Sequence, residues 1–208
     1  MNLSQPLDGL VRPMDAAILR ALARTVDGLT GRRIEQIIES RSRSGIVASL
    51  DRLVRIGIVS RAEVGNSALY SLNRQHLTWE PLFEILGASV ALQTELRNLV
   101  ERLYPEAPQP ATALYGSVAR GESTLESDID IVMVFRAGSS PSARASNVEL
   151  IERTIASRFG NRVEIVDIDI DQLSDLVRDN DPLAESWLDD AITVTGPNVK
   201  NLIRNVPR

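Results

Sequence analysis

The stretch Ala113–Phe135, ALYGSVARGESTLESDIDIVMVF, decides how the second half of the chain folds. It begins within a short apolar run, Thr112–Tyr115, which breaks at Gly116. A polar segment follows, and then the β-branched run Ile129–Phe135. This order predicts a strand, a tight turn, a short helix, a polar loop and a second strand.

Two carboxylates stand where the second strand is entered. Asp128 and Asp130 are two residues apart, so in a strand both project to one face while Ile129 and Ile131 project to the other. Adjacent carboxylates repel each other unless a cation lies between them. Oxygen ligands held in this way suit Mg²⁺ or Mn²⁺, which keep positions open for substrate phosphates. The sequence therefore predicts a metal site at the two aspartates.

The turn that precedes them has the features of a phosphate site. Gly116 allows the backbone to come close to a ligand, because glycine has no side chain. The amides after Ser117 open a helix whose N-terminus attracts anions. We therefore expect phosphate at the turn and metal at the aspartates.

Together these residues resemble a known family. A Gly-Ser pair, ten intervening residues and an Asp-Ile-Asp triplet resemble the DNA polymerase β-like nucleotidyltransferase superfamily, most closely its minimal, MNT-type branch. The pattern is specific because the ARGE and SD pieces between the two motifs also fit. The resemblance implies that the following residues bind the nucleotide: Gly116, Ser117, Arg120 and Ser127. It assigns the metal and the catalysis to Asp128 and Asp130.

The resemblance also implies a third carboxylate, on the strand predicted at residues 162–170. In the superfamily this acid points at the same metals and can take the proton from an attacking hydroxyl. Glu164 aligns with it, at a position where most members carry aspartate, and Asp167, at the opposite strand parity, is the alternative. The implied reaction is an in-line attack by a hydroxyl on the α-phosphorus of a nucleoside triphosphate, with ATP expected, and release of pyrophosphate.

Composition places limits on the class of protein. A chain of 208 residues with 43% hydrophobic residues can bury a core and allows one large domain or two small ones. It contains no cysteine, which excludes a disulfide framework and a cysteine-based zinc site. No apolar run approaches the ~18 residues of a membrane helix, and no secretory signal pattern opens the chain. We expect a cytoplasmic protein that does not bind a membrane.

Charge is distributed unevenly along the chain. Residues 1–80 hold eleven arginines against eight acidic residues, whereas the whole chain has a net charge of −5. The N-terminal part is also patterned as three helices, the first from Pro13 to Gly28, the second capped by Thr30 and the third closed by Gly57. Two strands around a Gly-Asn turn follow. Three helices and a strand pair predict a winged helix.

Residues 13–76 resemble bacterial winged helix-turn-helix regulators of the MarR or ArsR kind, most clearly in LDRLVRIGIVSR and ALYSLN. In that architecture the start of the third helix enters the major groove and the wing tip contacts the backbone or minor groove. The resemblance implies DNA contacts from Arg41, Ser42, Arg43, Ser44, Ser49, Arg52, Arg61 and Asn66. The partner would be double-stranded DNA with a palindromic operator, read by a homodimer. A solvated face on a dimerisation or protein-docking module is the alternative.

The remaining segments complete the expected organisation. Residues 79–104 predict one long amphipathic helix, and the proline-rich residues 105–110 predict a stiff linker. Residues 136–146 predict a loop and residues 147–159 a helix. We therefore expect an α/β (α+β) protein. Its parts are a winged helix-turn-helix domain at 1–78, a linking helix and linker at 79–110, and at 111–208 a minimal nucleotidyltransferase domain with a mixed sheet flanked by helices.

Three functions are compatible with these observations. The first is a DNA-binding transcriptional regulator whose second domain binds NTP–Mg²⁺ and transfers a nucleoside monophosphate to a hydroxyl acceptor. The second is an antitoxin-like protein nucleotidyltransferase that modifies a HEPN-type toxin, as some MNT-type proteins do. The third is a catalytically inactive protein that binds only a nucleotide or a partner.

Overall fold

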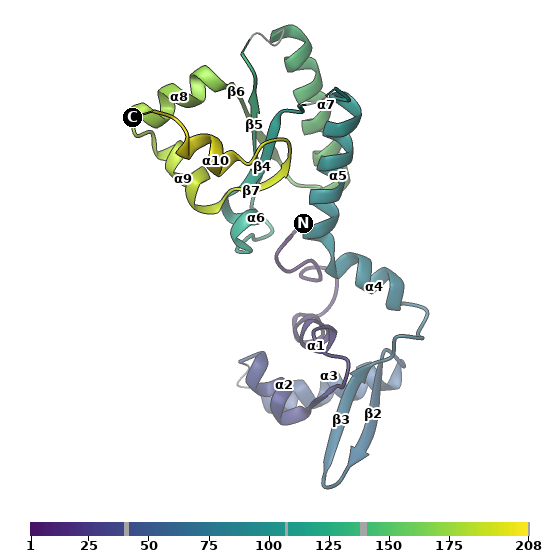
Figure 1. The fold of residues 1–208 in the computed structure, drawn as a ribbon. Coiled ribbons are helices and arrows are strands. Elements are labelled where there is room, and N and C mark those ends of the chain that lie inside the picture. The colour runs from purple at the N-terminus through teal and green to yellow at the C-terminus, as the bar shows by residue number, and fades with distance from the viewer. Residues whose placement is uncertain (40–41, 107, 138–140, 208) are drawn as a thin grey trace. The chain divides into compact units, whose positions relative to one another are not determined.

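The computed structural model describes residues 1–39, 42–106, 108–137 and 141–207, which form two compact units (Figure 1). One unit is Pro6–Gly87, and the other joins Met1–Gln5 to Ala88–Arg208. The first five residues thus belong to the C-terminal unit and not to the N-terminal domain expected at 1–78. None of the described helices is long and apolar enough to cross a membrane.

The Pro6–Gly87 unit combines helices with a small antiparallel sheet. Its described elements are α1 (Pro13–Ala23), β1 (Leu29–Thr30), α2 (Gly31–Ile37), α3 (Arg43–Arg55), β2 (Val59–Val64), β3 (Ser67–Leu72) and α4 (Trp79–Leu86). The strands lie in the order β1-β3-β2. Apolar residues of α1, α2 and α3 pack into one core, with Ile18, Ile34 and Leu50 fully buried. Thr30 caps α2 by accepting a hydrogen bond from the Arg33 amide, as the sequence predicts.

Two expected helices have different limits in the structure. The first helix ends at Ala23, several residues before Gly28. The single helix expected over 79–104 is divided, because α4 ends at Leu86 with Gly87 as its C-cap. The boundary between the two units, at Gly87 and Ala88, therefore falls inside the segment that the sequence predicts as one amphipathic helix.

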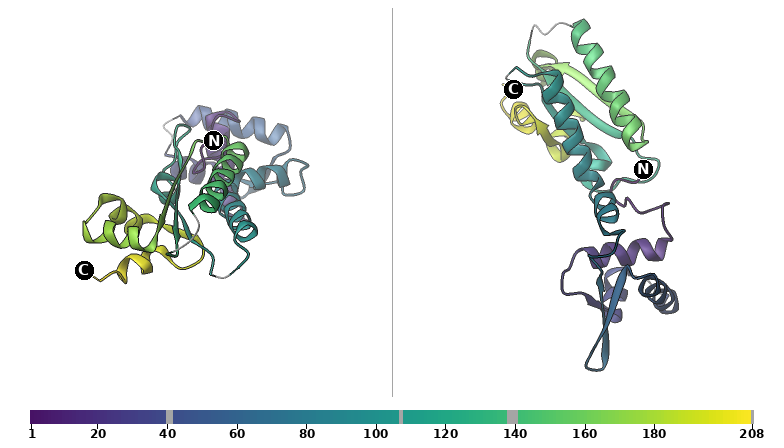
Figure 2. Two further views of the ribbon diagram at one scale, coloured as in Figure 1. Left: turned by 90° about the horizontal axis from the view of Figure 1, so that it is seen from above. Right: turned by 90° about the vertical axis from the view of Figure 1, so that its right-hand side faces the viewer.

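The C-terminal unit is a sheet covered on both faces by helices (Figure 2). Its described elements are α5 (Ala88–Leu103), β4 (Ala111–Tyr115), α6 (Gly116–Arg120), β5 (Ile129–Phe135), α7 (Pro141–Phe159), β6 (Val163–Asp169), α8 (Ile170–Arg178), α9 (Pro182–Asp190), β7 (Ile192–Thr195) and α10 (Val199–Arg204). The strand order is β6-β5-β4-β7. β4 runs antiparallel to β5 and β7, whereas β5 and β6 are parallel, so the sheet is mixed as predicted. Helix α7 occupies most of the segment expected as a loop at 136–146.

Strand alternation separates the two faces of the sheet. In β5, Ile129, Ile131 and Met133 pack into the core beneath α5 and α7. Val132 and Val134 belong to the opposite core, which α8, α9 and α10 cover around the fully buried Trp187. Asp130 has the parity of these two valines. It therefore lies on the face covered by α8, α9 and α10.

The five N-terminal residues form an arm that is docked into the C-terminal unit. Leu3 is 2% exposed and belongs to the core beneath α5 and α7. The Ser4 amide donates to Ser123 Oγ (2.9 Å) and the Ser123 amide donates to Ser4 Oγ (2.8 Å). Asn161 Nδ2 donates to the carbonyls of Met1 and Ser127, both at 2.9 Å. The arm therefore contacts the loop that leads to Asp128.

Candidate functional site

Gly116 brings the backbone directly against a carboxylate. It ends β4 and opens α6 with a φ of +71°, a conformation that L side chains rarely adopt. A Cβ at this position would collide with the carboxylate of Asp130. The half-buried Ser117 follows in the first turn of α6. Only glycine allows the turn and the aspartate to lie this close together.

Asp130 lies among other carboxylates. In the parallel pairing of β5 and β6 it is in register with Glu164. The pKa of Asp130 is raised to about 6, first by burial and then by the negative charges of Glu164, Asp128 and Asp190, while Arg120 opposes them. Arg120 opposes only part of the negative charge around Asp130, so the cluster needs further positive charge.

Arg162 supplies part of that charge. It lies at the start of β6, where its Nη2 is 2.7 Å from Glu164 Oε1 and its Nη1 is 3.7 Å from Asp128 Oδ2. Its side chain is 73% exposed and so can leave without disturbing the core. The backbone of Arg162 also pairs with β5, since the Ile129 amide donates to the Arg162 carbonyl at 2.9 Å.

The carboxylates at this end of the sheet have the oxygen chemistry that Mg²⁺ and Mn²⁺ prefer. As they stand, the described residues include no group of three or more His, Cys, Asp or Glu side chains that could hold a metal ion. The guanidinium of Arg162 already bridges two of the acids, Asp128 and Glu164. A cation among these acids would oppose the part of the pKa rise of Asp130 that the neighbouring charges cause after burial. The oxygen chemistry of these acids suits the metal, while Arg162 now contacts two of them.

Asp167, the alternative third acid, lies elsewhere. It pairs with Met133 in the sheet, so its parity is that of the face beneath α5 and α7. Its Oδ2 is 3.0 Å from Arg144 Nε on α7. Of the two acids that the sequence left open, Glu164 is the one beside Asp130.

The other residues assigned to the nucleotide have partners within the protein. Ser127 Oγ accepts a hydrogen bond from the Thr124 amide at 2.9 Å, which closes a turn just before Asp128. Arg120 lies in the last turn of α6. Its Nε donates to Glu122 Oε2 at 2.9 Å, and its Nη1 donates to Asp190 Oδ2 at 2.5 Å. The Arg120 side chain is therefore held by two carboxylates.

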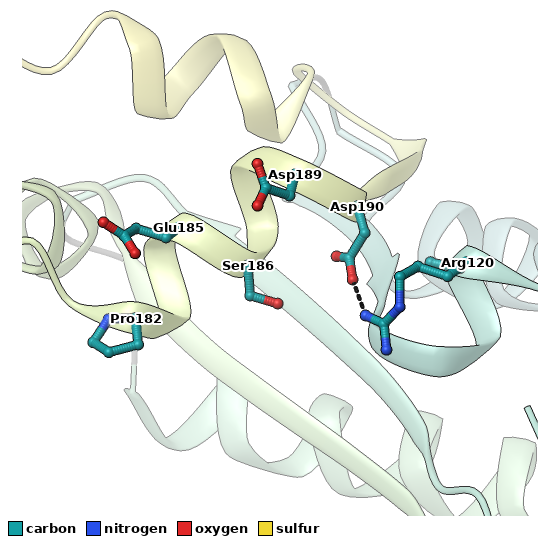
Figure 3. A pocket seen from close by; sticks show the side chains of 7 residues that line it. Arg120, Pro182, Glu185, Ser186, Asp189 and Asp190 are labelled. Carbon is teal, nitrogen blue, oxygen red and sulfur yellow. Dashed lines mark hydrogen bonds and ion pairs between the residues drawn. The ribbon is translucent and has the colours of Figure 1, made fainter. Parts of the chain in front are cut away.

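Asp190 is a site residue that the sequence analysis missed. Its Oδ2 also accepts a hydrogen bond from the Gly116 amide at 3.2 Å. With Arg120 it lines a pocket of about 660 Å³ between α6 and α9 (Figure 3). The remaining lining residues are Ala119, Pro182, Glu185, Ser186 and Asp189. Asp190 and Gly116 are 74 residues apart, and no motif spacing connects them.

The start of α3 presents part of the set assigned to DNA. Ser42, Arg43 and Ser44 are exposed there, and Ser42 Oγ also caps the helix by accepting from the Gly45 amide at 3.2 Å. Arg41 lies outside the described residues. On the strand pair, Arg61 is exposed and its Nη2 donates to Glu63 Oε1 at 2.6 Å. Asn66 is exposed at the turn between β2 and β3.

Two residues of that set are turned inward. Ser49 is 4% exposed, so it does not lie on the open face of α3. Arg52 forms a bidentate ion pair with the buried Asp15 of α1 and also donates to Ser49 Oγ at 3.1 Å. The resemblance to winged helix-turn-helix regulators implied DNA contacts from both. Instead they join α3 to α1, because the buried carboxylate of Asp15 requires a cation.

Comparison with known proteins finds a partial match within the C-terminal unit. The sequence profile described as "Polymerase beta, Nucleotidyltransferase" matches residues 101–180. A search of the curated proteins finds no match.

Similar solved structures include two of toxin–antitoxin systems, and each match covers 53% of this chain and 82% of the chain in that structure. One is a toxin-antitoxin with AMP-PNP (19% identity, TM-score 0.36), and the other is a mutant of the toxin-antitoxin MntA-HpeT (16% identity, TM-score 0.35).

Proposed function

We propose that the C-terminal unit binds a nucleoside triphosphate with a divalent metal and transfers a nucleoside monophosphate to a hydroxyl acceptor. Gly116 and Ser117 would hold the phosphates and Arg120 would neutralise part of their charge. Asp128, Asp130 and Glu164 would hold Mg²⁺ or Mn²⁺. The favoured triphosphate is ATP.

The observation that supports this proposal most strongly is the contact between the Gly116 turn and Asp130. A backbone turn suited to phosphate and a carboxylate suited to metal meet where an added Cβ would not fit. Glu164 is in register with Asp130 on the neighbouring strand. Phosphoryl transfer depends mainly on positioning and on electrostatic stabilisation, and this arrangement brings the required groups together.

Each group would have a distinct task in the reaction. A bound metal would stabilise negative charge on the phosphates and on the departing pyrophosphate. Glu164 would accept the proton of the attacking hydroxyl, since its carboxylate lies beside Asp130 and is half exposed. Arg162 would leave the acids when the metal arrives, which its exposed side chain permits.

Calorimetry would test the proposal with ATP, GTP, CTP and UTP in the presence of Mg²⁺. We expect metal-dependent binding by the wild-type chain and its loss in the Asp128→Asn, Asp130→Asn double variant. Asp167→Asn is the matched control, because it removes a carboxylate on the opposite face of the same sheet. Equal binding by the wild type and the double variant would refute the assignment of the metal site.

A second proposal concerns the Pro6–Gly87 unit, for which we infer DNA binding through a winged helix. The observation that favours it is the exposed start of α3, where Arg43 and Ser44 are available to base edges. Asn66 at the exposed turn between β2 and β3 would contact the backbone. A homodimer would read two halves of a palindromic operator.

Selection from genomic fragments, followed by titration at several salt concentrations, would test this second proposal. We expect binding that weakens steeply with salt and falls about tenfold or more in Arg43→Ala. Arg55→Ala is the control, since it removes the same charge about 18 Å away along the same helix. Binding without salt dependence, or equal loss in both variants, would contradict the proposed contact.

A further inference from the structure

Asp190 engages the same groups that the proposed function assigns to phosphate. It ends α9, and its side chain is only 9% exposed. Its Oδ2 accepts from the Gly116 amide at 3.2 Å and from Arg120 Nη1 at 2.5 Å. Figure 3 shows the Asp190 carboxylate turned toward the Arg120 guanidinium at the edge of the pocket. A single carboxylate oxygen of Asp190 therefore accepts hydrogen bonds from both the Gly116 amide and the Arg120 guanidinium.

The second oxygen shows that this contact is incompletely satisfied. Asp190 Oδ1 is buried and has no hydrogen-bond partner among the described residues. A carboxylate oxygen that loses water without gaining a donor is unfavourable. Asp190 is thus held by Arg120 and Gly116 on one side only. A ligand that offers Arg120 more oxygen atoms can displace it.

The charge of Asp190 also opposes a triphosphate. After burial, the negative charge of Asp190 is one of the charges that raise the pKa of Asp130. Phosphate oxygens at Gly116 would approach the Asp190 carboxylate closely, and two like charges repel strongly at short distance. The triphosphate and the contact of Asp190 with Gly116 and Arg120 therefore exclude each other.

We propose that Asp190 is an internal competitor of the nucleotide, which keeps the phosphate-binding groups engaged until a triphosphate displaces it. This proposal rests on the proposed function of the C-terminal unit. Because Asp190 is the last residue of α9, a displacement of that helix end would release Arg120 and Gly116 together. Affinity for the nucleotide is therefore set by a residue outside the Gly-Ser and Asp-Ile-Asp motifs.

Calorimetric titration with Mg²⁺-ATP of wild type, Asp190→Asn and Asp189→Asn would test the proposal. Asp190→Asn keeps an oxygen for the Gly116 amide and removes the charge. Asp189→Asn removes the same charge one residue away, from a side chain that lines the same pocket and has no described bond to Gly116 or Arg120. We expect Asp190→Asn to bind about tenfold more tightly than wild type and Asp189→Asn to change affinity by about twofold or less.

The outcomes separate this inference from the proposed function. Tighter binding in Asp190→Asn alone supports the competitor role, even if the wild type binds too weakly to detect. Wild-type binding that Asp190→Asn leaves unchanged or weakens would overturn the competitor role and leave the proposed function intact. No binding by wild type or Asp190→Asn would overturn both. Asp190→Ala, with thermal unfolding measured alongside, distinguishes lost charge from a disturbed turn.

Discussion

Asp15 and Asp130 are carboxylates withdrawn from water, one in each unit, and their surroundings differ. Asp15 is bound by the guanidinium of Arg52, so its charge is neutralised where it lies. Asp130 is half-buried and lies near the negative charges of Glu164, Asp128 and Asp190, and its pKa is raised to about 6 first by that burial and then by those charges. A carboxylate with its own cation joins two helices, whereas a carboxylate among carboxylates stores unfavourable energy. Such electrostatic conflict is typical of functional sites, and the comparison distinguishes structural acids from candidate catalytic ones.

The largest effect is expected from breaking the Asp130 side of this comparison with Gly116→Ala. The added Cβ would meet the Asp130 carboxylate in a backbone conformation that alanine disfavours. We expect a loss of about 3 kcal/mol in the free energy of unfolding, and loss of nucleotide binding. Gly121→Ala is the control, since Gly121 has the same φ of +71° and open space around the added atom. Denaturant titration of both variants would show the difference, and equal losses would mean that the close contact is unimportant.

The Asp15 side can be broken with Arg52→Ala, which leaves a buried carboxylate without its cation. We expect the free energy of unfolding to fall by about 2 kcal/mol, less than for a fully buried pair because Arg52 is partly exposed. Arg43→Ala, at the exposed start of the same helix, should leave stability unchanged. Urea unfolding monitored by circular dichroism measures both. A stable Arg52→Ala variant would show that the Asp15 pair is dispensable.

A pH series sharpens the comparison with a smaller effect. The pKa of Asp130 is about 6 in the folded protein and its ordinary value is 3.8. Between these two pH values the folded protein therefore keeps a proton on Asp130 that the unfolded chain has released. Stability from this group is therefore present at low pH and is lost as pH rises through about 6. After allowance for screening at this half-buried site, Asp130→Asn should exceed wild type by about 1 kcal/mol above pH 7 and converge with it near pH 4.

Thermal unfolding of wild type and Asp130→Asn, measured from about pH 4 to above pH 7 without added metal, would check this expected difference in stability. Asp167→Asn is the control, because it removes an ion pair with Arg144 instead of relieving repulsion. It should therefore show no gain in stability above pH 7. A constant difference between Asp130→Asn and wild type across the series would contradict the raised pKa.

The smallest effect is expected from Arg162→Ala, which removes the cation now shared by Asp128 and Glu164. Since Arg162 is largely exposed, we expect the free energy of unfolding to change by no more than about 0.5 kcal/mol. Arg178→Ala, which removes another exposed arginine with an acidic partner, is the stability control. Mg²⁺ should bind a few-fold more tightly to Arg162→Ala, as measured by calorimetry. Weaker Mg²⁺ binding would instead make Arg162 part of the site.

Sequence reasoning was most successful where local geometry decides the outcome. Strand alternation and glycine chemistry predicted the turn at Gly116 and the strand that carries Asp130. The family resemblance implied a third acid, with Glu164 aligned to it and Asp167 as the alternative. Only the register of β6 against β5 shows that Glu164, and not Asp167, lies beside Asp130. Tertiary partners explain the rest. Nothing near Arg52 in the sequence reveals that Asp15, 37 residues away, turns it inward, and nothing near Gly116 reveals Asp190.

The docked N-terminal arm changes the meaning of the domain arrangement. Because Met1–Gln5 and Ala88–Arg208 form one unit, the Pro6–Gly87 unit is an insertion within it and not an appended module. A fragment that starts at residue 88 would lack Leu3 and the serine pair that contacts the loop before Asp128. Folding of the inserted unit would shorten the effective loop between arm and core and lower the entropy cost of closing it. Docking of the arm is therefore less costly once the inserted unit has folded.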